Sequence, residues 1–200
     1  MLDRYAVIGG KQVKHSLSPK IHQAFAQQTG QSLQYEAIPV EYPTHVIQVL
    51  HSLQQRGFKG LNVTMPYKEQ VFHYLKERSF PLSERAQNAK AVNTLLFLER
   101  GVWQGDNTDG IGFIRDVANN LAWEMSHKRV LIFGAGGAAR GVVAELMRTK
   151  PQQIVIANRT LLRGRQLVEE LGYQDKIAVS ELIEIKPGQY DLSPSFNAIK

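Results

Sequence analysis

The segment from Val130 to Ala139 constrains the fold of this chain more than any other. It reads VLIFGAGGAA, an apolar run expected to form a buried strand that leads into glycines at the start of a helix. The pattern G-x-G-x-x-A in this position is typical of the first turn of a dinucleotide-binding unit. In such a turn Gly134 permits the sharp bend, and Gly136 lets a pyrophosphate approach the backbone. The alternative is a glycine-rich turn that serves packing alone. We expect dinucleotide contacts at Gly134, Ala135, Gly136, Gly137 and Ala138.

The end of the next expected strand indicates which dinucleotide is preferred. NAD-binding proteins usually carry Asp or Glu there to bind the ribose 2′-hydroxyl, but this sequence reads Asn158-Arg159-Thr160. A guanidinium pairs well with a phosphate, so Arg159 favours the 2′-phosphate of NADP. Arg165 is more simply explained as part of a solvated helix face. The expected cofactor is therefore NADP, bound also by Asn158, Arg159, Thr160 and Arg163.

The rest of the sequence alternates between short apolar segments and helical patterns. Ser18 followed by Pro19 predicts a helix start, with Ser18 as the N-cap residue. Arg100-Gly101 predicts the turn of a β-hairpin. Alternating strands and helices are typical of an α/β fold with a mostly parallel sheet covered by helices. Strands are expected at 5–9, 34–40, 60–64, 91–98, 102–105, 129–133, 153–157 and 177–179, and helices at 18–30, 45–55, 66–76, 83–89, 109–123, 137–150 and 161–171.

Composition excludes several classes of site and partner. The chain has no cysteine, which rules out disulfides, thiolate metal sites and cysteine nucleophiles, and we expect no metal. The net charge is +6, but lysines and arginines are scattered rather than gathered in a stripe, which disfavours a nucleic-acid partner. We recognise no secretory signal pattern and no apolar stretch long enough to span a membrane. These observations predict a cytoplasmic protein with neither a nucleic-acid nor a membrane partner, and they leave its oligomeric state open.

Three polar clusters lie at the ends of expected strands or at the starts of expected helices. They are HSLSP at residues 15–19, NVTMPYK at residues 62–68 and GDNTDG at residues 105–110. The carboxyl ends of parallel strands meet at one edge of a sheet. We therefore expect the three clusters to lie together although they are far apart in the sequence.

These clusters, with AVNT at residues 91–94 and the glycine-rich turn, resemble the shikimate dehydrogenase family from about residue 5 to residue 191. The strings NVTxPxK and DNTDG in this order are highly specific for that family. The resemblance implies reversible reduction of 3-dehydroshikimate to shikimate with NADPH, a step of chorismate and aromatic amino-acid biosynthesis. It also implies a substrate-binding catalytic domain at 1–109, a linker helix and linker at 110–128, and a Rossmann-type NADP domain at 129–200, with the active site in the cleft between the domains.

The resemblance also assigns roles to single residues. Lys68 matches the family's catalytic lysine, and Asp106 matches its carboxylate partner. Hydride transfer to a carbonyl leaves an alkoxide that needs a proton, which a lysine in a cleft can supply when burial lowers its pKa. On local pattern alone, Lys68 would be a solvated lysine in the first turn of a helix, and Ser18 a helix cap. The substrate-binding residues that the resemblance implies are Ser16, Ser18, Thr64, Asn93 and, less directly, Asn62.

The sequence departs from the family close to its last residues. A dinucleotide-binding domain has about six strands in two halves. After the linker this chain offers two clear strands, a short one at 177–179 and the start of another at 190–192, with Pro194 close behind. We therefore expect an incomplete cofactor domain in a truncated or disrupted form. Two alternatives to the active NADP-dependent enzyme stay open: a non-catalytic remnant that binds shikimate-like acids or NADP, and a dehydrogenase that also accepts quinate.

Overall fold

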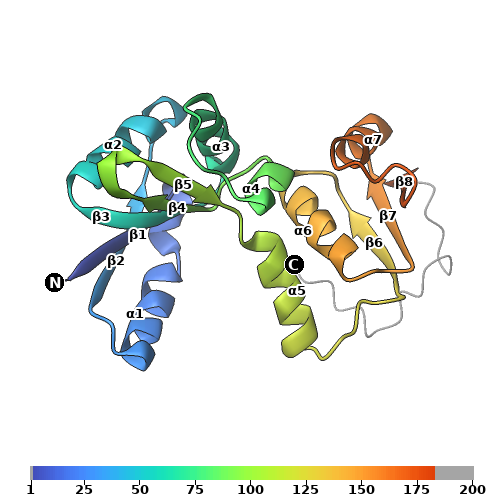
Figure 1. Cartoon of the computed structure of the whole chain (residues 1–200), viewed down its shortest axis with the longest axis horizontal. Helices are drawn as coiled ribbons and strands as arrows, with labels where there is room; N and C mark the ends of the chain where they lie inside the picture. Colours follow the sequence, from blue (N-terminus) through green and yellow to red (C-terminus); the bar gives the residue numbers. More distant parts are fainter. Residues whose placement is uncertain (1, 183–200) are drawn as a thin grey trace. The chain divides into compact units, whose positions relative to one another are not determined.

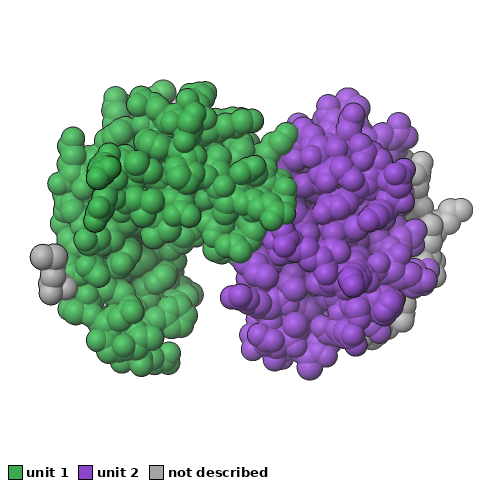
Figure 2. All heavy atoms as spheres, viewed as in Figure 1, with its two compact units in different colours: residues 1–108 green, residues 109–200 purple. Residues whose placement is uncertain are grey.

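The computed structural model describes residues 2–182 of the chain (Figure 1). The chain divides into two compact units, residues 1–108 and 109–200, which Figure 2 shows in different colours. Helix α5 (Asp109–Asn119) belongs to the second unit and packs there against helix α6 (Gly137–Arg148). The segment 110–128, expected to hold a linker helix and a linker, begins within this helix. The strand start expected at 190–192 lies outside the described residues.

The first unit is built around a five-stranded sheet in the order β2-β1-β3-β4-β5. Strand β1 pairs in parallel with β2 and β3, whereas β4 and β5 are antiparallel and form the predicted hairpin. Asn62 pairs with Thr94, and Thr94 pairs with Asp106, so the end of β3, the start of β4 and the end of β5 share one sheet edge. The strands are β1 (Asp3–Gly9), β2 (Leu33–Pro39), β3 (Phe58–Val63), β4 (Thr94–Phe97) and β5 (Trp103–Asp106).

The helices of the first unit bury apolar residues that recur at helical spacing. Leu50 and Leu53 on α2, and Val71 and Leu75 on α3, are almost completely buried. They form one hydrophobic core with strand residues that include Trp103, which is fully buried. The helices are η1 (Lys11–His15), α1 (Ser18–Thr29), η2 (Pro43–His45), α2 (Val46–Gln55), α3 (Lys68–Glu77), α4 (Glu84–Ala89) and η3 (Glu99–Gly101), where η marks a 3-10 helix.

In the described part of the second unit, a parallel sheet has the order β6-β7-β8. Helix α6 joins β6 to β7, and α7 joins β7 to β8, which is the βαβ arrangement predicted from the glycine-rich turn. Val143 and Leu146 of α6 pack with Ile154 and Ile156 of β7 and with Leu167 of α7. The α/β fold class is therefore confirmed. The strands are β6 (Arg129–Phe133), β7 (Gln153–Asn158) and β8 (Ile177–Glu181), and α7 spans Leu161–Glu170.

The start of α1 differs from its prediction. Leu17, not Ser18, is the N-cap residue, and no side chain caps the helix there. The Ser18 N–H instead donates to Ser16 Oγ at 3.2 Å, because the turn before the helix places Ser16 against it. The prediction that Ser18 is an N-cap residue was therefore wrong.

The segments that precede α1 and α3 differ from prediction in two further ways. Residues 11–15, where neither a strand nor a helix was expected, form the 3-10 helix η1, which is closed by the Ser16 N–H donating to the Val13 carbonyl at 2.9 Å. Helix α3 begins at Lys68 instead of Pro66, because Tyr67 N–H first closes a turn on the Thr64 carbonyl at 3.1 Å.

Among residues 2–182, no helix has the length and apolar character needed to cross a bilayer.

Candidate functional site

Backbone hydrogen bonds connect Lys68 and Asp106 through two neighbouring residues. The Val92 N–H donates to the Lys68 carbonyl at 2.9 Å, and the Asn93 N–H donates to the Asp106 carbonyl at 3.0 Å. The Asn93 carbonyl accepts the N–H of Val63, at the end of β3, at 2.8 Å. The start of α3 and the ends of β3 and β5 are thus attached to one short segment. Two of the three polar clusters recognised in the sequence lie together in the structure.

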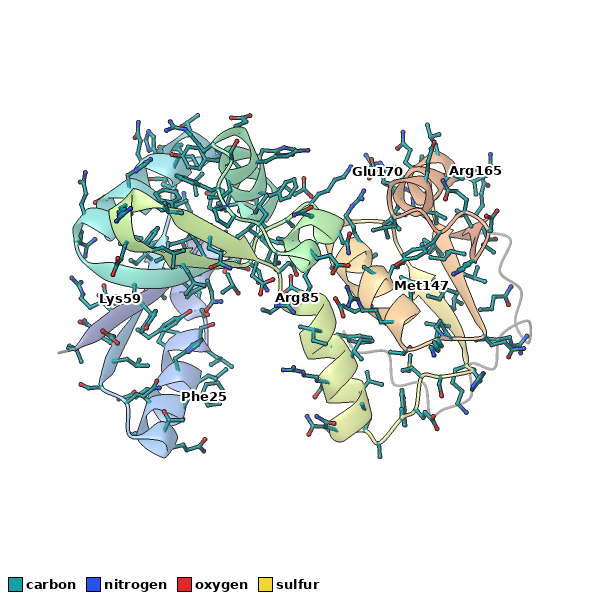
Figure 3. The ribbon with its side chains drawn as sticks, viewed as in Figure 1. Phe25, Lys59, Arg85, Met147, Arg165 and Glu170 are labelled. Carbon is teal, nitrogen blue, oxygen red and sulfur yellow. The ribbon has the colours of Figure 1, made fainter. Side chains whose placement is uncertain are left out.

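The carboxylate of Asp106 is bound by residues that sequence analysis did not single out. Its Oδ1 accepts hydrogen bonds from the Ser83 hydroxyl, from Arg85 Nε at 3.2 Å and from the Asn107 N–H at 2.7 Å. Its Oδ2 accepts from Arg85 Nη2 at 2.5 Å; Figure 3 labels Arg85 on α4. Burial raises the pKa of Asp106, but the hydrogen bonds from Arg85 and Ser83 outweigh it and hold the pKa below its ordinary 3.8. Asp106 is therefore ionised at neutral pH.

The side chain of Asn93 fixes the loop that follows β5. Asn93 is buried, and its Oδ1 accepts the Thr94 hydroxyl at 2.8 Å and the Thr108 N–H at 3.0 Å. Its Nδ2 donates to the Thr108 hydroxyl at 3.2 Å. Asn107 is also buried and donates to the Ala91 carbonyl at 3.1 Å. The side-chain amides of Asn93 and Asn107 hold the loop rigidly, because breaking the hydrogen bonds of either amide would leave a buried polar group unsatisfied.

A second polar network surrounds Asn62 at the end of β3. Its Oδ1 accepts the Tyr35 hydroxyl at 2.5 Å, and its Nδ2 donates to the Asn93 carbonyl at 3.3 Å. Burial raises the pKa of Tyr35, so its phenol stays protonated and able to donate. The Tyr35 ring stacks on His22 with 4.1 Å between ring centroids. Sequence analysis named Asn62 but missed Tyr35 and His22, because this contact joins α1, β2 and β3 and leaves no local pattern.

His22 predicts a pH-dependent stability of the first unit. Burial lowers its pKa below 6.5, and a hydrogen bond with Asn62 offsets this only in part. The unfolded chain therefore binds a proton on His22 more tightly than the folded chain does. The stability that the neutral His22 contributes is fully present above pH 6.5, the ordinary pKa of histidine. It is lost as the pH falls from there through the lower pKa that His22 has in the folded chain. We expect the urea midpoint, followed by Trp103 fluorescence in a Trp123→Phe background, to fall as the pH is lowered from about 7.5 to about 5.5.

In the variant His22→Gln the urea midpoint is expected to fall by less over the same pH range, because glutamine does not titrate. The control is His73→Gln, which removes an exposed histidine from the same unit. If the urea midpoint fell equally in both variants and in the unmodified chain, His22 would not be the cause of the pH dependence.

The serine pair follows β1 and η1 along the chain, and Thr64 is attached to the carboxyl end of β1. Ser16 Oγ donates to Ser18 Oγ at 3.0 Å, in the segment that follows β1 and η1. The Thr64 N–H donates to the Ile8 carbonyl at 2.9 Å. A Cβ on Gly9 would meet Thr64 Cγ2 at 2.4 Å, so glycine is needed for Thr64 to lie this close to β1. The Gly10 N–H also donates to the Met65 carbonyl at 3.2 Å, so the start of the segment that leads to the first polar cluster lies beside the second cluster.

The glycine-rich turn has the geometry that dinucleotide binding requires. Gly134 has a φ of +97°, a value that residues with a side chain rarely adopt. Gly136 is the N-cap residue of α6, and a Cβ there would meet nothing within 4 Å, so the space beside it is open. The first turn of a helix offers N–H groups without partners inside the helix and a positive dipole end. The residues of this turn therefore fit a pyrophosphate.

The residues expected to bind the adenosine part lie at the same end of the sheet. The Gly134 N–H donates to the Ala157 carbonyl at 2.8 Å, which places the turn beside the end of β7. Asn158 closes β7 and donates through Nδ2 to the Thr160 carbonyl at 2.7 Å. Arg159 follows directly and is exposed, as are Arg163 and Arg165 on α7, the last of which Figure 3 labels.

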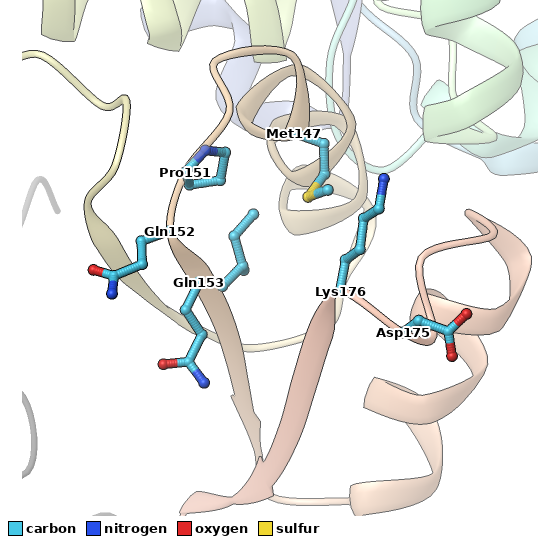
Figure 4. A pocket seen from close by; sticks show the side chains of 7 residues that line it. Met147, Pro151, Gln152, Gln153, Asp175 and Lys176 are labelled. Carbon is cyan, nitrogen blue, oxygen red and sulfur yellow. The ribbon is translucent and has the colours of Figure 1, made fainter.

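A hollow of about 450 Å³ in the second unit is separate from this turn. It lies at the amino-terminal ends of β7 and β8, whereas Gly134 and Asn158 lie at carboxyl ends of strands. The described residues hold no cluster of three or more His, Asp or Glu suited to a metal ion. The side chains around the hollow are those of Met147, Pro151, Gln152, Gln153, Ile154, Asp175 and Lys176 (Figure 4).

Two family models and several known proteins match this chain. Residues 8–95 match the family model of the shikimate dehydrogenase substrate binding domain, and residues 116–188 match that of shikimate / quinate 5-dehydrogenase. The chain is 49% identical over 160 residues to the shikimate dehydrogenase (NADP(+)) of Methylobacillus flagellatus, covering 80% of this chain and 57% of that protein. It is 41% identical over 192 residues to that of Chromobacterium violaceum, covering 96% of this chain and 68% of that protein.

Solved structures show the same fold. The chain resembles an Ael1 enzyme from Pseudomonas putida with a TM-score of 0.81 and 40% identity, over 90% of this chain and 63% of that one. It resembles Thermus thermophilus shikimate 5-dehydrogenase, solved with NADP(H) and shikimate, with a TM-score of 0.75 and 31% identity, over 89% of this chain and 62% of that one. It thus spans about 57–68% of the length of these relatives. From its two matched domain models and its sequence identity to these relatives, the chain belongs to the shikimate dehydrogenase family.

Proposed function

We propose that this chain carries the substrate-binding and NADP-binding parts of an enzyme that reversibly reduces 3-dehydroshikimate to shikimate. The observation that carries the proposal is the hydrogen-bonded network that joins Lys68, Asn93 and Asp106 in a chain of this family. The relatives from Methylobacillus flagellatus and Chromobacterium violaceum are named shikimate dehydrogenase (NADP(+)), which supports the same reaction for this chain. The enzyme would act in the formation of chorismate and the aromatic amino acids.

In this proposal, Lys68 and Asp106 carry the proton chemistry. The cofactor supplies the hydride that reduces the carbonyl carbon, and the oxygen that results needs a proton. Lys68, at the first residue of α3, gives that proton from its ammonium group and takes it back in the reverse direction. Asp106 is ionised and accepts a hydrogen bond from a substrate hydroxyl or from the lysine ammonium. That Asp106 is the partner of Lys68 stays a prediction.

The remaining polar residues of the first unit bind and orient the substrate. Ser16 and Ser18 each carry a hydroxyl that can donate to a carboxylate oxygen. The Ser18 hydroxyl is not used as a helix cap, which supports this role. Thr64 and Asn93 bind ring hydroxyls or the carboxylate, and Asn62, held by Tyr35, orients the segment around Asn93.

The second unit holds the cofactor in this proposal. Gly134, Ala135, Gly136, Gly137 and Ala138 bind the pyrophosphate at the start of α6. The adenosine end is bound by Asn158, Arg159, Thr160 and Arg163, and the exposed guanidinium of Arg159 pairs with the 2′-phosphate.

The test is oxidation of shikimate by the purified 200-residue chain, followed by the absorbance of NADPH. We expect turnover with NADP⁺ that exceeds turnover with NAD⁺. Arg159→Leu is expected to weaken NADP⁺ binding about 10- to 100-fold, because a charge-assisted hydrogen bond to phosphate is lost. The matched control, Arg165→Leu, removes the same charge from α7 and is expected to change binding by less than about twofold.

Other outcomes separate the alternatives. Thermal stabilisation by shikimate or NADP⁺ without turnover would indicate a non-catalytic ligand-binding chain. Equal rates with quinate and shikimate would indicate a quinate/shikimate dehydrogenase. If the chain showed no turnover and neither shikimate nor NADP⁺ stabilised it, the proposed function would be contradicted.

A further inference from the structure

The first turn of helix α4 is built around the carboxylate of Asp106. Ser83 is the N-cap residue of α4, and its Oγ accepts the Ala86 N–H at 3.0 Å while its single hydroxyl proton is donated to Asp106 Oδ1. Arg85 places Nε on Oδ1 at 3.2 Å and Nη2 on Oδ2 at 2.5 Å. This is the bidentate pairing of a guanidinium with a carboxylate, which fixes orientation as well as charge. The Asp106 side chain is 19% exposed and that of Arg85 is 40% exposed.

These contacts use the two carboxylate oxygens unequally. An ionised carboxylate can accept about four hydrogen bonds, shared between its oxygens. Oδ1 accepts from Ser83, from Arg85 Nε and from the Asn107 N–H, whereas Oδ2 accepts from Arg85 Nη2. The acceptor capacity that is left is therefore at Oδ2. A carboxylate without these contacts could rotate and offer either oxygen.

We propose that Arg85 and Ser83 are positioning residues that act through Asp106, fixing its carboxylate so that Oδ2 is the oxygen that binds a hydroxyl group of the substrate. The inference rests on the proposed function for the identity of the substrate. The arrangement of the carboxylate itself is independent of it. A lysine in place of Arg85 would keep the positive charge but lose the fork that fixes both oxygens.

The first test follows the ionisation of Asp106 by carboxyl carbon NMR in the 200-residue chain. In Arg85→Met the pKa of Asp106 is expected to rise, because two hydrogen bonds and the neighbouring charge are lost while burial stays. The control Arg115→Met removes an exposed arginine from α5 and is expected to leave the titration of Asp106 unchanged. An unchanged pKa in Arg85→Met would overturn the proposal.

The second test is a double-mutant cycle on shikimate binding, measured by calorimetry. Arg85→Met is expected to weaken binding about tenfold in the unmodified chain. In an Asp106→Asn background the same substitution is expected to change binding by less than about twofold, because its effect passes through the carboxylate. Arg85→Lys is expected to restore the low pKa of Asp106 in part but not the affinity. Equal losses of affinity in both backgrounds would show a merely structural role and would overturn the proposal.

The two tests distinguish failure of this inference from failure of the proposed function. If the unmodified chain does not bind shikimate at millimolar concentration, the proposed substrate is contradicted, and the NMR titration still decides whether Arg85 sets the state of Asp106. If the unmodified chain binds shikimate but the titration is unaffected by Arg85→Met, the proposed function stands and the inference about Arg85 is wrong.

Discussion

Replacing Lys68 by methionine is expected to lower the rate of NADP-dependent shikimate oxidation by about 10²- to 10⁴-fold, the usual contribution of a positioned acid–base group. Lys68 is half-buried at the start of α3, and its carbonyl is bound by Val92 next to Asn93. Methionine preserves the length and helix propensity of the side chain but cannot carry a proton. The loss should therefore appear in kcat, whereas the dissociation constant for shikimate should change by only a few fold. Steady-state kinetics and calorimetry measure the two quantities separately.

The matched control is Lys59→Met. Lys59 is an exposed lysine on β3 of the same unit, labelled in Figure 3, so its removal changes the net charge equally. We expect it to leave kcat within about twofold, since surface charges contribute little. If Lys68→Met and Lys59→Met reduced the rate equally, Lys68 would not be the proton donor. If both left it unchanged, the role taken from the family would be wrong for this chain.

Replacing Gly110 by alanine is expected to destabilise the second unit by about 1–3 kcal/mol, the usual cost of forcing an atom into a packed contact. The added Cβ would lie 2.3 Å from the Gly141 carbonyl oxygen and 3.0 Å from Glu145 Cγ. Glycine at 110 lets α5 pack closely against the backbone of α6 at Gly141, so the two helices would have to move apart. Urea unfolding followed by far-UV circular dichroism and Trp123 fluorescence would measure the shift of the midpoint.

Gly112→Ala provides the control on the same helix. A Cβ at Gly112 would meet nothing within 4 Å. Alanine there should raise the stability of the unit by up to about 1 kcal/mol through helix propensity. The two substitutions are thus expected to act in opposite directions. A loss of stability from Gly112→Ala as large as that from Gly110→Ala would mean that the contact with Gly141 is not the cause.

Much of the fold was predictable because its signals are local. The glycine-rich turn combined an apolar strand, glycines at fixed spacing and a helix, and Gly134 does adopt a left-handed φ. The hairpin at Arg100-Gly101 was predictable for the same reason, since both residues adopt positive φ. Boundaries set by hydrogen bonds to other segments were less accurate. The N-cap of α1 was misplaced because the side chain that accepts a backbone N–H in the turn before the helix is that of Ser16, which accepts the N–H of Ser18.

The sequence alone determined which chemical groups this chain has and at which strand ends they lie. It named Lys68, Asp106 and Asn93 through strings whose spacing is specific to one family. Only the tertiary structure decided which groups act on one another. Arg85 lies 21 residues before Asp106, and Tyr35 lies 27 residues before Asn62. Contacts over such separations depend on the order of strands in the sheet and on how helices pack against it, and no local pattern records them. The partners that keep Asp106 ionised and orient Asn62 therefore became visible only in the folded chain.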